Sequence, residues 1–94
     1  MKVVDYMPTI CMFYGILIKM YNEKGTKHNI PHFHAEYGEF EVVMDFDGNV
    51  IEGSLPKGKL RLVKAWTELH RDDLIANWGL LSNGEQFFRI PPLQ

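Results

Sequence analysis

Three residues able to do chemistry alternate along segment 30–37, which reads Ile-Pro-His-Phe-His-Ala-Glu-Tyr. Because neighbouring side chains of an extended strand point to opposite faces, His32, His34 and Glu36 are expected to share one exposed face. The apolar residues between them share the other face. Two imidazoles and a carboxylate at this spacing suit a metal site, a general acid–base pair, or a contact to an anion or nucleotide. We treat the three as candidate catalytic residues and leave these three kinds of chemistry open.

Metal binding is the alternative that uses His32 and His34 as ligands. Neutral imidazole binds zinc, iron, nickel or copper, but a tight site needs a third or fourth ligand from elsewhere in the chain. No cofactor is therefore expected from the sequence, and a divalent transition metal is kept as the alternative.

A second group, Lys57, Arg61 and Lys64, has the spacing i, i+4, i+7, which places the three on one side of a helix. We call it the basic stripe. Cations near a helix N-terminus oppose the helix dipole, so the stripe breaks a local rule without structural gain, as functional sites often do. It predicts contact with an acidic partner protein or with RNA phosphates. The alternative is a solvated basic face partly balanced by Glu68.

The two remaining histidines are further candidates for binding. His28 lies in a polar segment leading into the His-Phe-His strand and could reach the same face. His70 falls at a predicted break between helices, where a cation interacts favourably with a helix C-terminus.

Composition predicts one compact domain spanning residues 1–94, with 46% hydrophobic residues. The longest apolar run is too short to cross a bilayer, so no membrane contact is expected. The single cysteine and the lack of a secretory leader favour a cytoplasmic protein. A net charge of -2 and a pI near 6.0 give no global attraction to nucleic acid, so any basic surface is local.

Apolar patterning predicts an antiparallel sheet of three or four strands. Segment 13–21, rich in β-branched and aromatic residues, is expected to form one buried central strand, and segment 32–37 follows it. Segment 39–46 alternates as a half-buried strand should. Asp47-Gly48 predicts a tight turn into a short returning strand. The alternating apolar residues are Phe40, Val42, Met44 and Phe46.

Beyond Ser54 the apolar period changes from two to about 3.6, which predicts two C-terminal helices. Ser54 is a candidate N-cap, with Pro56 in the first turn. The two apolar stripes are displaced by one position, which predicts a break at residues 70–72 and an end at Asn83-Gly84. The stripes are Leu62, Val63, Trp66 and Leu69, then Leu74, Ile75, Trp78 and Leu81.

The tail over residues 86–94 is too apolar to be free, and we expect it to pack back or to be covered by a partner. Together these elements predict an α+β domain, an antiparallel sheet of three or four strands packed against two C-terminal helices.

Five short motifs are spread over the chain from Met7 onward. They are Met-Pro-Thr-Ile at 7–10, Phe-Tyr-Gly-Ile at 13–16, Pro-His-Phe-His-Ala-Glu-Tyr-Gly at 31–38, Glu-Gly-Ser-Leu-Pro at 52–56, and the tryptophan-bounded segment 66–78. Together they resemble the bacterial domain of unknown function family 4160, and residues 1–6 fall outside the pattern as an N-terminal extension. One departure is Ile30, where the family usually has the first proline of Pro-Pro-His-Phe-His.

The resemblance implies a genomic association like that of toxin–antitoxin modules, beside a small protein of uncharacterised family 2442. The expected function is therefore a small module that binds this cognate protein, and RNA in a bolder version, through the strand face and the basic stripe. A ribonuclease-type toxin is the catalytic form of this hypothesis. Two competing hypotheses are a small metal-binding protein and a non-catalytic dimer in which an edge strand pairs between two copies.

Overall fold

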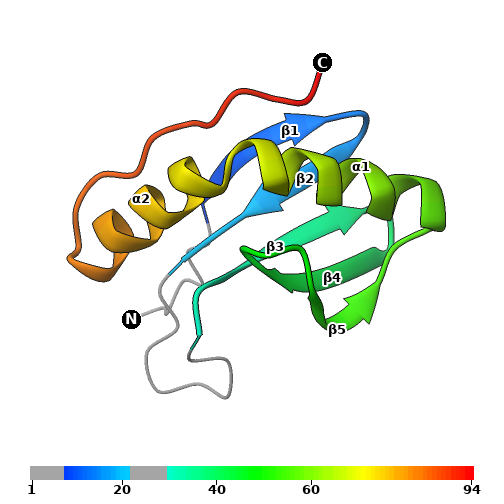
Figure 1. Ribbon diagram of the computed structural model, residues 1–94, viewed down its shortest axis with the longest axis horizontal. Helices are drawn as coiled ribbons and strands as arrows, with labels where there is room; N and C mark the ends of the chain where they lie inside the picture. Colours follow the sequence, from blue (N-terminus) through cyan, green and yellow to red (C-terminus); the bar gives the residue numbers. More distant parts are fainter. Residues whose placement is uncertain (1–7, 22–29) are drawn as a thin grey trace, which may run out of the picture.

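The computed structural model describes residues 8–21 and 30–94, which form a two-layer α+β fold (Figure 1). The described residues contain a five-stranded antiparallel sheet in the order β1-β2-β3-β4-β5, with two helices over one of its faces. The predicted fold class is confirmed, but the sheet has more strands than the three or four expected. The strands are β1 (Thr9–Phe13), β2 (Ile16–Lys19), β3 (His32–Tyr37), β4 (Phe40–Asp45) and β5 (Val50–Ser54).

The additional strand arises from a turn that the sequence prediction missed. Segment 13–21 is not one central strand, because Tyr14 and Gly15 form a two-residue turn between β1 and β2. Their φ angles are 50° and 79°, the geometry that matches the twist of a hairpin. A Cβ on Gly15 would lie 3.2 Å from a ring carbon of Tyr37. Both the positive φ and this close contact therefore favour glycine at position 15. The central strand is therefore β3.

The core lies between the sheet and the helices, and Trp66 of α1 is at its centre. The Trp66 ring centroid is 5.7 Å from that of Phe13 on β1 and 5.9 Å from that of Phe33 on β3. The predicted alternation after residue 39 is confirmed only in part. Val42 and Met44 of the expected apolar face are fully buried, but Phe40 is 42% exposed, and Val43, expected on the other face, is buried as well. The aromatic contacts join the edge strand β1 and the central strand β3 to one helical side chain.

The helices α1 (Lys57–Leu69) and α2 (Arg71–Ser82) follow one another across the sheet (Figure 1). The predicted break is confirmed at His70, and Asn83 ends α2 as expected. Ser54 is not the N-cap, because it is the last residue of β5 and the helix begins one residue after Pro56. No helix within the described residues is long and apolar enough to span a membrane.

The two apolar stripes are only partly buried. Leu69, at the last position of α1 beside the break at His70, is 69% exposed. On α2, Leu74 is fully buried and Trp78 and Leu81 pack against the core, but Ile75 is 45% exposed. The polar Asn77 is fully buried in α2 as well, which the apolar periodicity did not predict.

The tail packs back along the helices toward β1, as predicted (Figure 1). The Ile90 N–H donates to the Ile10 carbonyl at 2.8 Å, and the Trp66 Nε1–H donates to the Pro91 carbonyl at 2.9 Å. The Asn77 side chain exchanges two hydrogen bonds with the Phe88 backbone, at 2.8 and 2.9 Å. The buried Asn77 amide thus pairs the backbone of Phe88, as a neighbouring strand would do.

We predict that Asn77→Ala destabilises the protein by about 2 kcal/mol, because the N–H and the carbonyl of Phe88 both lose their partner. Urea denaturation measures the change. Asn83→Ala is the matched control, since Asn83 is exposed at the end of α2, and its effect should stay under about 0.5 kcal/mol. Equal effects of the two substitutions would contradict this role of Asn77.

Candidate functional site

The two histidines of β3 lie side by side inside the protein. His32 is 1% exposed and His34 is 8% exposed, and their ring centroids are 5.4 Å apart. The expectation of an exposed histidine face is therefore wrong. Two aromatic side chains explain the burial: the Tyr21 ring stacks on His34 at 6.0 Å, and the Trp78 ring of α2 lies 5.3 Å from His32.

Each buried histidine has a hydrogen bond that fixes its ring. His32 Nδ1 donates to the Ile30 carbonyl at 2.7 Å, and His34 Nδ1 lies 3.0 Å from a Glu41 carboxylate oxygen. A carboxylate bound to one imidazole nitrogen holds the ring in one tautomer and one orientation. His34 with Glu41 thus has the geometry of an oriented acid–base pair.

Glu41 is the member of this cluster that sequence reasoning missed, whereas the predicted Glu36 is occupied elsewhere. Glu36 forms an ion pair with Lys19 at 3.1 Å and is half-buried. A signal for Glu41 was present in the sequence: a short turn at Gly38 pairs Tyr37 with Phe40 and so places Glu41 beside β3. The carboxylate that orients His34 therefore comes from the neighbouring strand.

Metal ligation by His32 and His34 would need further ligands. Within residues 8–21 and 30–94, no group of three or more histidine, cysteine, aspartate or glutamate side chains is arranged to hold a metal ion. Tight transition-metal sites use three or four protein ligands. The described residues thus offer no complete ligand set for the metal alternative.

The other two predicted histidines are in different situations. His28 lies outside the described residues. His70 joins the two helices, where its Nδ1 is 3.2 Å from an Asp73 carboxylate oxygen and its ring centroid is 5.6 Å from that of Trp66. His70 is thus held by the start of α2 and by the core tryptophan.

The basic stripe is on the surface of α1. Lys57, Arg61 and Lys64 are all exposed, and α1 has no acidic residue in its first turn. Among the described residues, their side chains make no ion pair or hydrogen bond. Lys59 differs, because its Nζ donates to the Tyr14 carbonyl at 3.2 Å and lies over the Tyr37 ring. The stripe is therefore charge that the described fold does not use.

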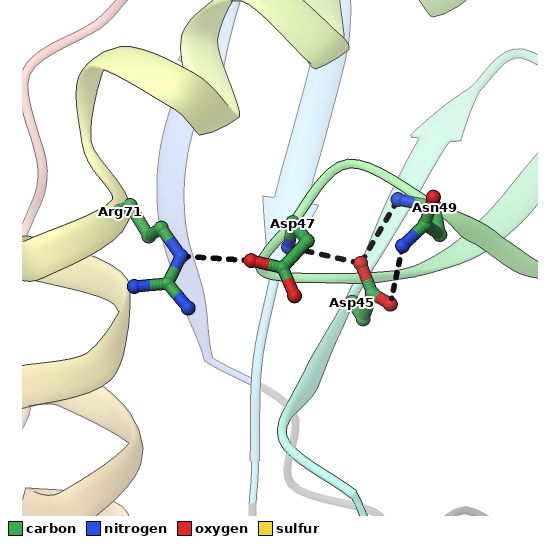
Figure 2. Close-up of polar contacts among 4 residues, drawn as sticks. All are labelled: Asp45, Asp47, Asn49 and Arg71. Atoms are coloured by element: carbon green, nitrogen blue, oxygen red, sulfur yellow. Dashed lines mark hydrogen bonds and ion pairs between the residues drawn. The ribbon is translucent and has the colours of Figure 1, made fainter.

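A polar junction that the sequence did not indicate joins the β4–β5 turn to the start of α2 (Figure 2). Arg71 Nε donates to Asp47 Oδ1 at 2.9 Å. The Asp45 carboxylate accepts bonds from the backbone N–H groups of Asp47 and Asn49, each at 2.9 Å, and from the Asn49 side chain at 3.1 Å. These bonds fix the turn, so that Asp47 faces Arg71.

Two open hollows lie on either side of the Asp47–Arg71 ion pair. The first, the polar hollow, is lined by Lys64 and Glu68 of α1 and by the turn residue Asn49. The second, the apolar hollow, has a volume of about 360 Å³ and is lined by Ile30, Pro31 and Ile75, with Asp45 at its polar side. Both hollows also include Phe46, Asp47 and Arg71, so the ion pair forms a ridge between them.

The turn hydrogen bonds set the charge state of Asp45. Partial burial by itself raises the pKa of this carboxyl, but the bonds from Asn49, Asp47 and Gly48 outweigh it and lower the pKa below the ordinary value of 3.8. A lowered pKa in the folded state stabilises the fold above the unfolded value. This stabilisation is lost as the pH falls through the folded pKa.

Comparison with known families shows where these residues fall in a shared domain. The family described as "Domain of unknown function (DUF4160)" matches residues 15–79, more than half of the chain. The chain belongs to this family. The range matched to DUF4160 runs from the β1–β2 turn into α2 and so contains the β3 histidines, the basic stripe and the polar junction. No curated protein and no solved structure matches the chain significantly.

We predict that Asp45→Asn lowers stability at pH 7 by about 1 kcal/mol, because an amide replaces a carboxylate that accepts three hydrogen bonds. The difference from wild type should shrink as the pH falls through the lowered pKa of Asp45, where the wild-type carboxylate becomes protonated as well. Urea denaturation at pH 7 and at a series of lower pH values measures it. The control Asp72→Asn alters an exposed aspartate in the first turn of α2, and a pH-independent defect in Asp45→Asn would contradict the prediction.

Proposed function

We propose that this protein is the partner-binding module of a toxin–antitoxin-like pair, and that its basic stripe binds an acidic cognate protein. The cognate partner is the small family 2442-like protein that the family resemblance implies. The observation that carries the proposal is the unused positive charge of Lys57, Arg61 and Lys64. A chain with a net charge of -2 keeps these three exposed cations unpaired among its described residues, and Lys57, in the first turn of α1, also opposes the helix dipole.

Rim charges of this kind contribute to partner choice and to the rate of association. Complementary charge steers encounter and suppresses wrong partners, while exposed ion pairs add modest affinity. An acidic surface across from the stripe would therefore provide specificity, with most of the binding energy coming from adjoining apolar contacts. The buried histidines of β3 are not part of this docking surface.

We predict that Arg61→Glu weakens binding of the neighbouring gene's protein roughly tenfold, because one cation in the middle of the stripe becomes an anion. Arg89→Glu is the matched control, since Arg89 is also exposed but lies on the tail. Isothermal titration calorimetry at low and high salt measures the affinity of both variants for the partner. The difference in affinity between Arg61→Glu and wild type should be smaller at high salt, because salt screens exposed charges.

Two outcomes would overturn the proposal. Equal losses of partner affinity in the Arg61→Glu and Arg89→Glu variants would show that the basic stripe is not the binding surface. Stripe-dependent retention of a short single-stranded RNA, with partner binding unchanged in Arg61→Glu, would instead assign the stripe to RNA.

A second candidate function, acid–base cleavage of RNA, is favoured by the His34–Glu41 pair. A histidine oriented by a carboxylate can remove a proton from a 2′-hydroxyl, and a neighbouring histidine can donate one to the leaving oxygen. His32 lies next to His34 and supplies that second imidazole. This function requires that the substrate reach two buried rings.

For this second candidate we expect induced expression to arrest growth, and Glu41→Gln to relieve the arrest by removing the carboxylate that orients His34. Glu41 has a side chain that is 50% exposed, so the substitution should leave the fold intact. Glu39→Gln, an exposed change one residue before β4, is the control. If cells expressing Glu41→Gln and cells expressing Glu39→Gln both grow as cells expressing wild type do, the catalytic hypothesis is wrong.

The metal-binding and structural-dimer hypotheses have direct measurements. Elemental analysis of untagged protein tests ligation of a transition metal by His32 and His34. Light scattering tests the structural dimer. The edge strands available for pairing between copies are β1 and β5, and β1 already has the tail hydrogen-bonded to its Ile10 carbonyl.

A further inference from the structure

The surface beside the basic stripe continues into features that the stripe alone does not explain. Lys64 belongs both to the stripe and to the polar hollow. Asp47 and Arg71, whose ion pair is drawn in Figure 2, line both this hollow and the apolar hollow. The basic stripe, the polar hollow and the apolar hollow therefore form one continuous surface, which we call the track.

Resting on the proposed function, we infer that the partner docks through an acidic segment ending in a bulky apolar residue. Its acidic residues lie along the basic stripe, and the apolar side chain enters the hollow lined by Ile30, Pro31 and Ile75. The occupant is thus a segment of an acidic partner protein, and a second copy of this chain or RNA would be a different result.

The apolar hollow offers what an anchor residue needs. Ile30 is 47% exposed and Ile75 is 45% exposed, although both are large aliphatic side chains. Single exposed apolar residues are ordinary, but these two come from separate elements and line the same hollow with Pro31. A buried apolar anchor of this kind typically supplies much of the energy of an interface.

The polar hollow has a different role because its charges cancel. Lys64 and Arg71 are opposed by Asp47 and Glu68 around its rim. Neither sign of charge is favoured there, so this part of the track suits the backbone or a neutral polar side chain. The acidic residues of the partner segment belong at Lys57 and Arg61, away from Glu68.

Helix geometry gives the spacing of the partner segment. Lys57 and Lys64 are seven positions apart, which is about 10 Å along the helix axis. An extended peptide covers this length in roughly three residues. The acidic part of the segment is therefore short and lies within a few positions of the apolar anchor.

The ridge between the hollows is held in place before binding. The three hydrogen bonds to the Asp45 carboxylate fix the turn that carries Asp47, and Asp47 in turn holds Arg71. A preformed surface loses less conformational entropy on binding than a flexible one. Rigidity of the turn thus supports a docking role for both hollows.

The experiment is thiol footprinting with the full chain and the neighbouring gene's protein as the probe. Ile75→Cys places a thiol in the apolar hollow, and Leu69→Cys places a matched one on an exposed apolar position of α1 outside it. The native Cys11 contributes little background, because it is buried and its burial raises its pKa. Alkylation rates are compared with and without a saturating probe.

We expect the probe to slow alkylation at position 75 at least tenfold and to leave position 69 unchanged. Binding that Arg61→Glu weakens, together with an unprotected thiol at position 75, would overturn this inference and leave the proposed function standing. A probe that does not bind the wild-type chain would overturn both. Protection at position 75 that rises with the protein's own concentration, without the probe, would replace the partner segment by a second copy.

Discussion

The packing of one side chain, Trp66, holds this fold together. Its ring contacts Phe13 of β1 and Phe33 of β3, and its indole N–H donates to the Pro91 carbonyl of the tail. One fully buried residue thus joins the first strand, the central strand, the helix and the C-terminal segment. The large apolar area of tryptophan makes it suited to this position, and the indole N–H requires a partner once it is buried. The tail carbonyl is that partner.

The hydrogen bonds of His32 and His34 on β3 serve stability and could also serve chemistry. Burying two imidazoles costs free energy unless their polar atoms are hydrogen-bonded, and the Ile30 carbonyl and Glu41 provide partners for the two Nδ1 atoms. The same bonds would orient the rings for proton transfer. Sequence spacing alone does not separate a satisfied buried histidine from a catalytic one, because both require alternation along a strand and a fixed ring.

The surface cations outside this cluster are of two kinds: those that bond to another part of the chain and those that do not. Lys19, Lys59 and Arg71 each hold two parts of the chain together through an ion pair or a hydrogen bond. The basic stripe does not, and it leads into two hollows that share the Asp47–Arg71 ion pair in their lining. Groups that the fold leaves unused, placed beside a preformed hollow, favour a function in recognition.

The sequence by itself determined the α+β class, the helix break at His70 and the return of the tail, because each depends on local periodicity, turn chemistry or apolar content. It also placed the basic stripe on one helix side. Only the tertiary structure decided that Tyr14-Gly15 divides a strand, that His32 and His34 are buried, and that Arg71 meets Asp47. Those outcomes depend on which distant segments pack together, and local spacing carries no information about that.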